Sequence, residues 1–139
     1  MKIKFVDLVA QYKEIESEID SAIKSVIGKS AYVGGPFVSE FEKRFANYLG
    51  VKYCVGVGNG TDAIFISLKS LGVGEGDEVI VPANSFIATS EAVSLTGAQV
   101  VFVDCEPSSF NLDFADLEKK ITGKTKAVIP VHLYGQPVD

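Results

Sequence analysis

Apolar residues recur at two different spacings along the chain, and the change of spacing divides it into two parts. In the first part, apolar side chains at positions 12, 15, 19, 23 and 26 share one face of a helix, and charged side chains occupy the other. This spacing predicts an amphipathic helix over 12–27, closed by Gly28. After a loop, Ser39 and Glu42 match a capping box, which predicts a second helix over 39–49.

From residue 53 onward, short apolar runs alternate with helical segments. The runs at 53–57, 78–81, 99–103 and 127–131 are nearly all apolar, as expected for strands buried on both faces. The segments at 61–71, 85–95 and 113–121 have helical spacing, and Asp113 is a suitable cap for the last one. Strands separated by single helices are βαβ units, so we predict an α/β fold with a mostly parallel sheet flanked by helices. We expect amino-terminal helices and a linker in residues 1–52, and the start of an α/β domain in residues 53–139.

Composition and charge exclude several classes of function. The 139 residues carry 13 Lys and Arg against 18 Asp and Glu, a net charge of −5, so a nucleic-acid-binding face is not expected. No apolar run approaches the roughly 20 residues that span a bilayer, and no signal core precedes Gln11. Cys54 and Cys105 form neither a disulfide framework nor a metal-ligand spacing. We therefore expect a cytoplasmic protein without membrane, nucleic-acid or metal partners.

The segment 58–63, Gly-Asn-Gly-Thr-Asp-Ala, follows a predicted strand and opens a predicted helix. Glycines let a backbone approach an anion closely, and the free N–H groups of a helix start can hold a phosphate. The same residues also suit a tight Asn-Gly turn in which Thr61 or Asp62 simply caps the helix. The segment matches the G-x-G-x-x-A dinucleotide fingerprint too, but the next strand ends without the acidic residue that holds a ribose.

Ligands of parallel sheets bind at the carboxyl ends of the strands, and three more residues follow predicted strands there. Phe86 either stacks on a flat cofactor or belongs to the core. Asp104 is either a turn residue or an active-site carboxylate. His132, the only histidine, is either a hydrogen-bonded structural residue or part of a substrate pocket.

Taken together, these segments resemble the amino-terminal part of the DegT/DnrJ/EryC1/StrS family of sugar aminotransferases. The matching blocks, in the order and spacing of that family, are residues 37–42, 58–63, 76–82, 85–89 and 125–135. The resemblance implies the fold type I aminotransferase architecture, pyridoxal 5'-phosphate (PLP) as cofactor and a homodimer. It also implies a nucleotide-linked keto-sugar as amino acceptor and glutamate as the amino donor.

The resemblance also assigns roles to individual residues. The turn of Gly60, Thr61 and Asp62 is implied to hold the cofactor phosphate, and Phe86 to pack against the pyridine ring. His132 and Tyr134 become candidates for the substrate pocket.

The family's chemistry needs a lysine that forms a Schiff base with PLP and an acid that faces the pyridine nitrogen. In the family both lie beyond the block that matches 132–135, and this sequence ends at Asp139. We therefore expect no catalytic residue in this chain, which alone would be inactive, within a parent enzyme of deoxyamino-sugar or surface-polysaccharide synthesis. The alternatives are a non-catalytic fragment or regulatory homologue with the same fold and, less favoured, a nicotinamide-dinucleotide-binding domain.

Overall fold

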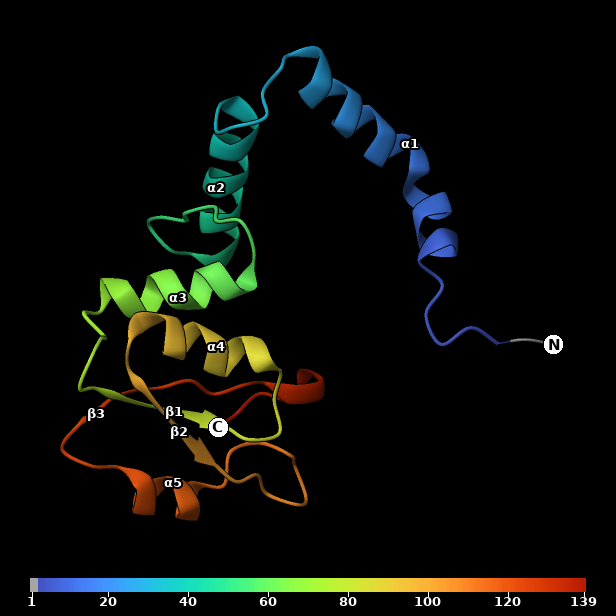
Figure 1. Ribbon diagram of the computed structural model, residues 1–139. Helices are drawn as coiled ribbons and strands as arrows, with labels where there is room; N and C mark the ends of the chain where they lie inside the picture. Colours follow the sequence, from blue (N-terminus) through green and yellow to red (C-terminus); the bar gives the residue numbers. More distant parts are fainter. Residues whose placement is uncertain (1–2) are drawn as a thin grey trace. The chain divides into compact units, whose positions relative to one another are not determined.

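The structure, a computed structural model, describes residues 3–139 and contains two compact units, which meet in the sequence between Gly56 and Val57. The first unit holds two helices, α1 (Leu8–Gly28) and α2 (Pro36–Leu49) (Figure 1). Asp7 caps α1 by accepting a hydrogen bond from the backbone N–H of Ala10 at 3.1 Å, so this helix begins before the predicted residue 12. No described helix of the chain has the length and apolar character needed to cross a membrane.

The second helix begins at Pro36, and the predicted capping box is wrong. Proline suits the first helical position because its ring fixes φ and its missing N–H would find no partner there anyway. Ser39 consequently lies inside α2. The Glu42 carboxylate accepts instead from the backbone N–H of Gly56 at 2.7 Å, which ties the segment after α2 to the helix.

The second unit contains the α/β part of the chain. Its elements in chain order are α3 (Gly60–Ser70), β1 (Glu78–Pro82), α4 (Ile87–Thr96), β2 (Gln99–Val103), α5 (Phe114–Lys120), β3 (Thr125–Val128) and the 3-10 turn η1 (Leu133–Gly135). The three strands form a parallel sheet in the order β2-β1-β3, with β1 in the centre. The parallel α/β architecture predicted from the sequence is therefore confirmed.

The predicted strand at 53–57 is wrong for this structure. These residues pair with no strand of the described chain, and the side chains of Tyr53 and Val55 are 74% and 75% exposed. An extended segment becomes a strand only when a neighbouring backbone accepts and donates its hydrogen bonds, and no such neighbour is present in residues 3–139. The apolar run is real, but the sequence pattern alone does not reveal whether a partner strand exists.

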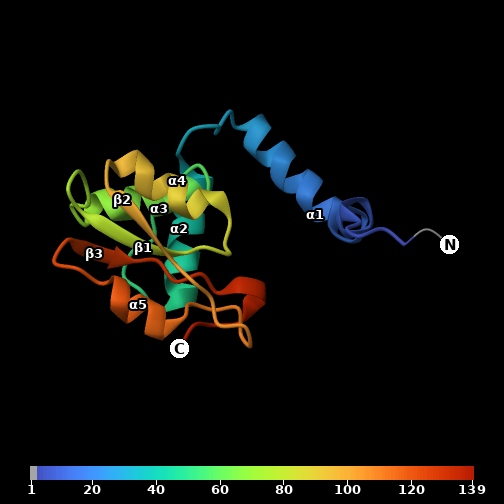
Figure 2. The same ribbon diagram turned by 60° about the horizontal axis from the view of Figure 1, so that its bottom comes forward.

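The central strand separates two apolar layers. Val79 and Val81 pack with Leu68 of α3 and Val93 of α4, whereas Ile80 packs on the other face with Val103. Leu117 of α5 covers this second cluster. Figures 1 and 2 show the resulting arrangement, with α3 and α4 on one side of the sheet and α5 on the other. Because β1 is covered on both faces and both edges, its position fixes where the other strands end.

The outer edge of β3 borders an apolar groove of about 360 Å³. Its walls come from α3 and from the segment that begins in β3; they include Ala63, Ile64, Leu71, Ala127 and Ile129. Among the described residues, β3 pairs with β1 alone, so one row of its backbone groups has no strand partner in this part of the chain.

We predict that Ile80→Ala lowers the free energy of unfolding by about 2–5 kcal/mol, because the deletion leaves a cavity in the central strand's buried face. The change is measured as a shift in the urea unfolding curve. Val128→Ala in β3, where the side chain is 37% exposed, is the matched control and should cost much less. Equal losses for the two variants would contradict the central role of β1.

Candidate functional site

The amino end of α3 lies at the carboxyl edge of the sheet. This helix is followed by the loop 71–77 and then by β1, and it packs on the sheet through Leu68. Helix and strand therefore run in opposite directions, and the start of α3 comes to the end at which β1 finishes (Figure 1). The site anticipated in the sequence for a phosphate is thus placed at the edge where parallel sheets bind ligands.

Asn59 is the residue that caps α3, not Thr61 or Asp62. Its side-chain oxygen accepts from the backbone N–H of Asp62 at 2.9 Å, and its Nδ2 donates to the Asp62 carboxylate at 2.9 Å. The Asn59 carbonyl accepts from the backbone N–H of Ala63 at 3.1 Å. The simple-turn interpretation predicts a cap correctly but assigns it to Thr61 or Asp62, whereas the capping side chain is that of Asn59, within the turn itself.

Two backbone donors remain at this helix end. The N–H groups of Gly60 and Thr61 open the helix and therefore have no acceptor within it. They lie at the positive end of the helix dipole, and the half-buried Thr61 side chain adds a hydroxyl beside them. This set of donors fits a phosphate group. Asp62 fits it less well, since its N–H is already engaged by Asn59 and its carboxylate repels an anion.

Phe86 immediately precedes α4, at the carboxyl end of β1. Its side chain is 77% exposed, so it is not part of the core of the second unit. The ring borders a hollow of about 200 Å³ that Pro82, Ser85 and Phe102 also line. An exposed aromatic ring at this edge has a face available for a flat ligand, whereas the core alternative finds no support in the described residues.

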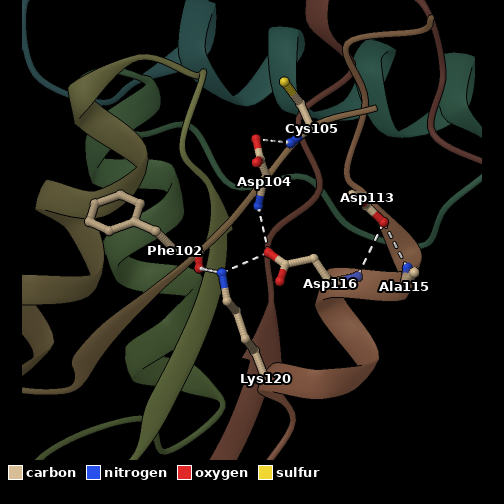
Figure 3. A network of polar contacts seen from close by, with 7 residues as sticks. All are labelled: Phe102, Asp104, Cys105, Asp113, Ala115, Asp116 and Lys120. Atoms are coloured by element: carbon tan, nitrogen blue, oxygen red, sulfur yellow. Dashed lines mark hydrogen bonds and ion pairs between the residues drawn. The ribbon is translucent and has the colours of Figure 1, made fainter. Parts of the chain in front are cut away.

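Asp104, at the end of β2, is a turn residue. Its Oδ1 accepts from the backbone N–H of Cys105 at 2.8 Å, and its own backbone N–H donates to Asp116 at 2.9 Å. Lys120 donates to the same Asp116 carboxylate at 2.6 Å and to the Phe102 carbonyl at 2.8 Å (Figure 3). This network fastens the start and the end of α5 to β2, which explains the acids here without any catalytic role.

Asp113 caps α5 as the sequence predicts. Its Oδ1 accepts from the backbone N–H groups of Ala115 at 2.8 Å and Asp116 at 3.1 Å (Figure 3). The described residues hold no group of three or more His, Cys, Asp or Glu side chains arranged to bind a metal ion.

His132 and Tyr134 lie together in the segment that follows β3. The Nδ1 atom of His132 accepts from the backbone N–H of Val138 at 3.0 Å. Tyr134 is 84% exposed and has a left-handed backbone with φ of 56°. Its ring meets that of Phe110 edge to face, with 6.0 Å between the ring centroids. Both residues therefore lie at the same edge of the sheet as the other candidates.

Two asparagines at this edge were not recognised as candidates in the sequence. Asn84 Nδ2 donates to the Phe110 carbonyl at 2.9 Å, and Asn111 Nδ2 donates to the Pro137 carbonyl at 3.1 Å. Both bonds join residues 26 positions apart. The sequence signal is weak: Asn84 stands shortly after a predicted strand and Asn111 shortly before a predicted helix, and a loop asparagine is common at both places for purely local reasons.

Comparison with known proteins agrees with this arrangement. The sequence matches the DegT/DnrJ/EryC1/StrS aminotransferase family over residues 13–139. This chain belongs to that family. The resemblance noted in the sequence is thereby confirmed, and the nicotinamide-dinucleotide alternative loses its basis.

Individual relatives support the assignment. The chain is 49% identical, over 99% of its length, to "UDP-2-acetamido-2-deoxy-3-oxo-D-glucuronate aminotransferase" of Pseudomonas aeruginosa. It is 50% identical, over its whole length, to "Erythromycin biosynthesis sensory transduction protein EryC1" of Saccharopolyspora erythraea. The solved structure of NtdA from Bacillus subtilis, with bound cofactor PMP, covers 99% of the chain with a TM-score of 0.93 at 38% identity. The chain spans 38% of the first two relatives and 32% of NtdA.

We predict that Asp116→Asn lowers the stability of the chain at neutral pH. The hydrogen bond from Lys120 is the main reason that the pKa of Asp116 lies below its usual value of 3.8, and the bond from Asp104 adds to it. A lowered folded-state pKa means that the carboxylate stabilises the fold above pH 3.8, and that this contribution is lost as the pH falls from there through the folded pKa.

The test is urea unfolding of both forms across this pH range. The difference in the free energy of unfolding between wild type and Asp116→Asn should shrink as the pH falls below 3.8. Glu118→Gln removes an exposed carboxylate from the same helix and serves as the control, with little expected change. If the difference in the free energy of unfolding did not depend on pH, the ion pair between Asp116 and Lys120 would not be what stabilises this end of β2.

Proposed function

We propose that this chain is the amino-terminal portion of a PLP-dependent aminotransferase that transfers an amino group, from glutamate, to a nucleotide-linked keto-sugar. The observation that carries the proposal is the start of α3, where two free backbone N–H groups and the Thr61 hydroxyl meet at the carboxyl edge of the sheet. Membership of the aminotransferase family supports it, as does the UDP-linked oxo-sugar substrate in the name of the Pseudomonas relative.

In this proposal the chain binds and orients the cofactor. Gly60 and Thr61 hold the phosphate through their N–H groups and the Thr61 hydroxyl, with Asp62 contributing if its N–H leaves Asn59. Phe86 covers one face of the pyridine ring. PLP itself supplies the aldehyde that takes up the amino group and a ring that withdraws electrons. The PMP bound in NtdA, the aminated form of PLP, supports this choice of cofactor.

His132 and Tyr134 are proposed to face the sugar substrate. Both are exposed at the edge where the phosphate donors and Phe86 lie, and each carries a polar hydrogen-bonding group. Neither is assigned a chemical step. The lysine and the acid that the reaction needs are proposed to lie in the part of the relatives' length that this chain does not span.

We propose residues 1–52 as amino-terminal helices and linker, residues 53–139 as the start of the PLP-binding domain, and a cytoplasmic homodimer as the working form. The exposed apolar stripe of α1 and the open apolar groove beside β3 support association with further protein surface.

A regulatory homologue is the second candidate function. The observation that favours it is that the Saccharopolyspora relative is named a sensory transduction protein. The two candidates differ in whether the full-length protein turns over an amino donor when PLP and a nucleotide keto-sugar are supplied. Tight PLP binding without any transfer of amino nitrogen would favour the regulatory candidate.

For the phosphate site, we expect Thr61→Val in the full-length protein to weaken PLP binding by about 1.5–3 kcal/mol, the scale of one hydrogen bond to a charged group. Fluorescence titration with PLP measures the loss. Ser67→Ala, which removes a hydroxyl further along the same helix, is the control and should leave affinity unchanged. Unaltered affinity in Thr61→Val would mean that the segment 58–63 is only a turn.

Residues 1–139 alone should form no specific covalent bond with PLP. Lys69, Lys119 and Lys124 are exposed, and Lys120 is engaged with Asp116 and the Phe102 carbonyl. Borohydride reduction with PLP, followed by mass spectrometry, should therefore give label scattered over exposed amines. Stoichiometric label on one lysine of this chain would overturn the expectation and place the reactive amine within it.

A further inference from the structure

Two carboxamides join the three loops that leave the carboxyl ends of the strands. Asn84, after β1, donates to the carbonyl of Phe110, in the loop after β2. Asn111, the next residue, donates to the carbonyl of Pro137, in the segment after β3. Each loop that leaves the sheet at this edge is thus held by its neighbour, and Asn111 is the connection to the segment that carries His132 and Tyr134.

The buried position of Asn111 suits a specific role better than general packing. The residue is 8% exposed, its backbone N–H donates to Ser109, and its carbonyl accepts from Glu106. Its Oδ1 atom is buried with no hydrogen-bond partner among the described residues. Rotating the amide would not help, because Oδ1 would then face the Pro137 carbonyl, another acceptor. Burying the Asn111 Oδ1 atom without a partner is unfavourable for folding. We therefore look for a specific role of Asn111 in the bond that its Nδ2 donates to the Pro137 carbonyl.

Backbone strain coincides with this connection. Phe110 and Tyr134 have φ of 59° and 56°, in the left-handed region that bulky residues avoid. Their rings meet at 87° with centroids 6.0 Å apart, so the two strained positions support each other. Such residues persist where their surroundings hold them, and they concentrate at functional sites. The segment 132–138 is therefore held at two points, by the amide of Asn111 and by the aromatic pair.

The held segment fixes the chemical state of the only histidine. Val138, the residue after Pro137, donates its N–H to Nδ1 of His132 at 3.0 Å. An Nδ1 that accepts a hydrogen bond carries no proton, so the neutral ring carries its proton on Nε2. The bond from Asn111 to Pro137 positions this donor. In this tautomer His132 offers an Nε2–H donor, two residues before Tyr134 in the sequence.

We propose that Asn111 is a positioning residue that sets the Nε2–H tautomer of His132 by holding Pro137 and Val138 in place. The inference rests on the proposed function and deepens it, because it says what the segment 132–138 offers a substrate. A neutral N–H and a phenol address the uncharged acceptor oxygens of a sugar ring. Asn111 touches neither cofactor nor substrate in this role and acts through His132.

The test uses residues 1–139 with nitrogen-15 label in histidine alone, without a His tag and in mildly alkaline buffer. His132 is the only histidine, so each ring nitrogen gives one signal. The wild type should show an unprotonated Nδ1 and a protonated Nε2. Asn111→Asp, which cannot donate to Pro137, and Asn111→Ala should give mixed tautomers and about tenfold faster hydrogen exchange at the Val138 amide. Asn47→Asp, on the exposed surface of α2, adds the same charge and should change neither.

A second variant removes the donor without touching the buried amide. Val138→Pro has no backbone N–H and should give the same mixed tautomers as Asn111→Asp. Unchanged ring signals in either Asn111 variant or in Val138→Pro would overturn the proposal. Faster hydrogen exchange at the amides of β1 in the Asn111 variants would also overturn it, because Asn111 would then stabilise the whole second unit rather than the segment 132–138. The readout involves no PLP, so it stands or fails independently of cofactor binding and of Thr61→Val.

Discussion

The arrangement of the second unit of this chain depends on the complete burial of its central strand. Val79, Ile80 and Val81 are 0% exposed, and β1 has a parallel neighbour on each side. The register of a strand that lies between two apolar layers is constrained, because a shift by one residue would exchange the side chains that face each layer. Its register sets that of β2, paired from Glu78 with Gln99 to Pro82 with Val103. The loops at 83–86 and 104–112 therefore leave the sheet side by side, and this is why Asn84 reaches Phe110.

Much of this architecture could be predicted from the sequence, because burial on both faces leaves an apolar run that few other structures require. The runs at β1, β2 and β3 were recognised for that reason, as was the cap at Asp113, whose bonds are local. The predicted strand at 53–57 is wrong because a strand needs hydrogen bonds to a neighbouring strand, and no local sequence pattern shows whether that neighbour exists. The capping box at Ser39 failed for the opposite reason: the motif was present, but Pro36 already provided a better start to the helix.

The candidate site also contains features that local sequence predicts and features that depend on distant residues. Gly60, Thr61 and Phe86 could be proposed from short segments, since a helix start and a residue after a strand are local features. Asn84 and Asn111 could not, because their partners are 26 residues away and an asparagine in a loop has many local explanations. Long-range polar contacts of this kind become visible only when the packing of β1 has brought the loops together.

At the start of α3, the helix cap and the proposed phosphate site use different backbone donors. The N–H groups of the first four residues, Asn59 to Asp62, have no acceptor within the helix, and the Asn59 side chain satisfies one of them, that of Asp62. The cap does not engage the N–H groups of Gly60 and Thr61, which are the two donors proposed to hold the phosphate. Asn59 also holds the Asp62 carboxylate, whose Oδ2 lies 2.8 Å from where a side-chain carbon on Gly58 would be. A side chain at position 58 would therefore require the Asp62 carboxylate to move, which would disturb its bond with Asn59.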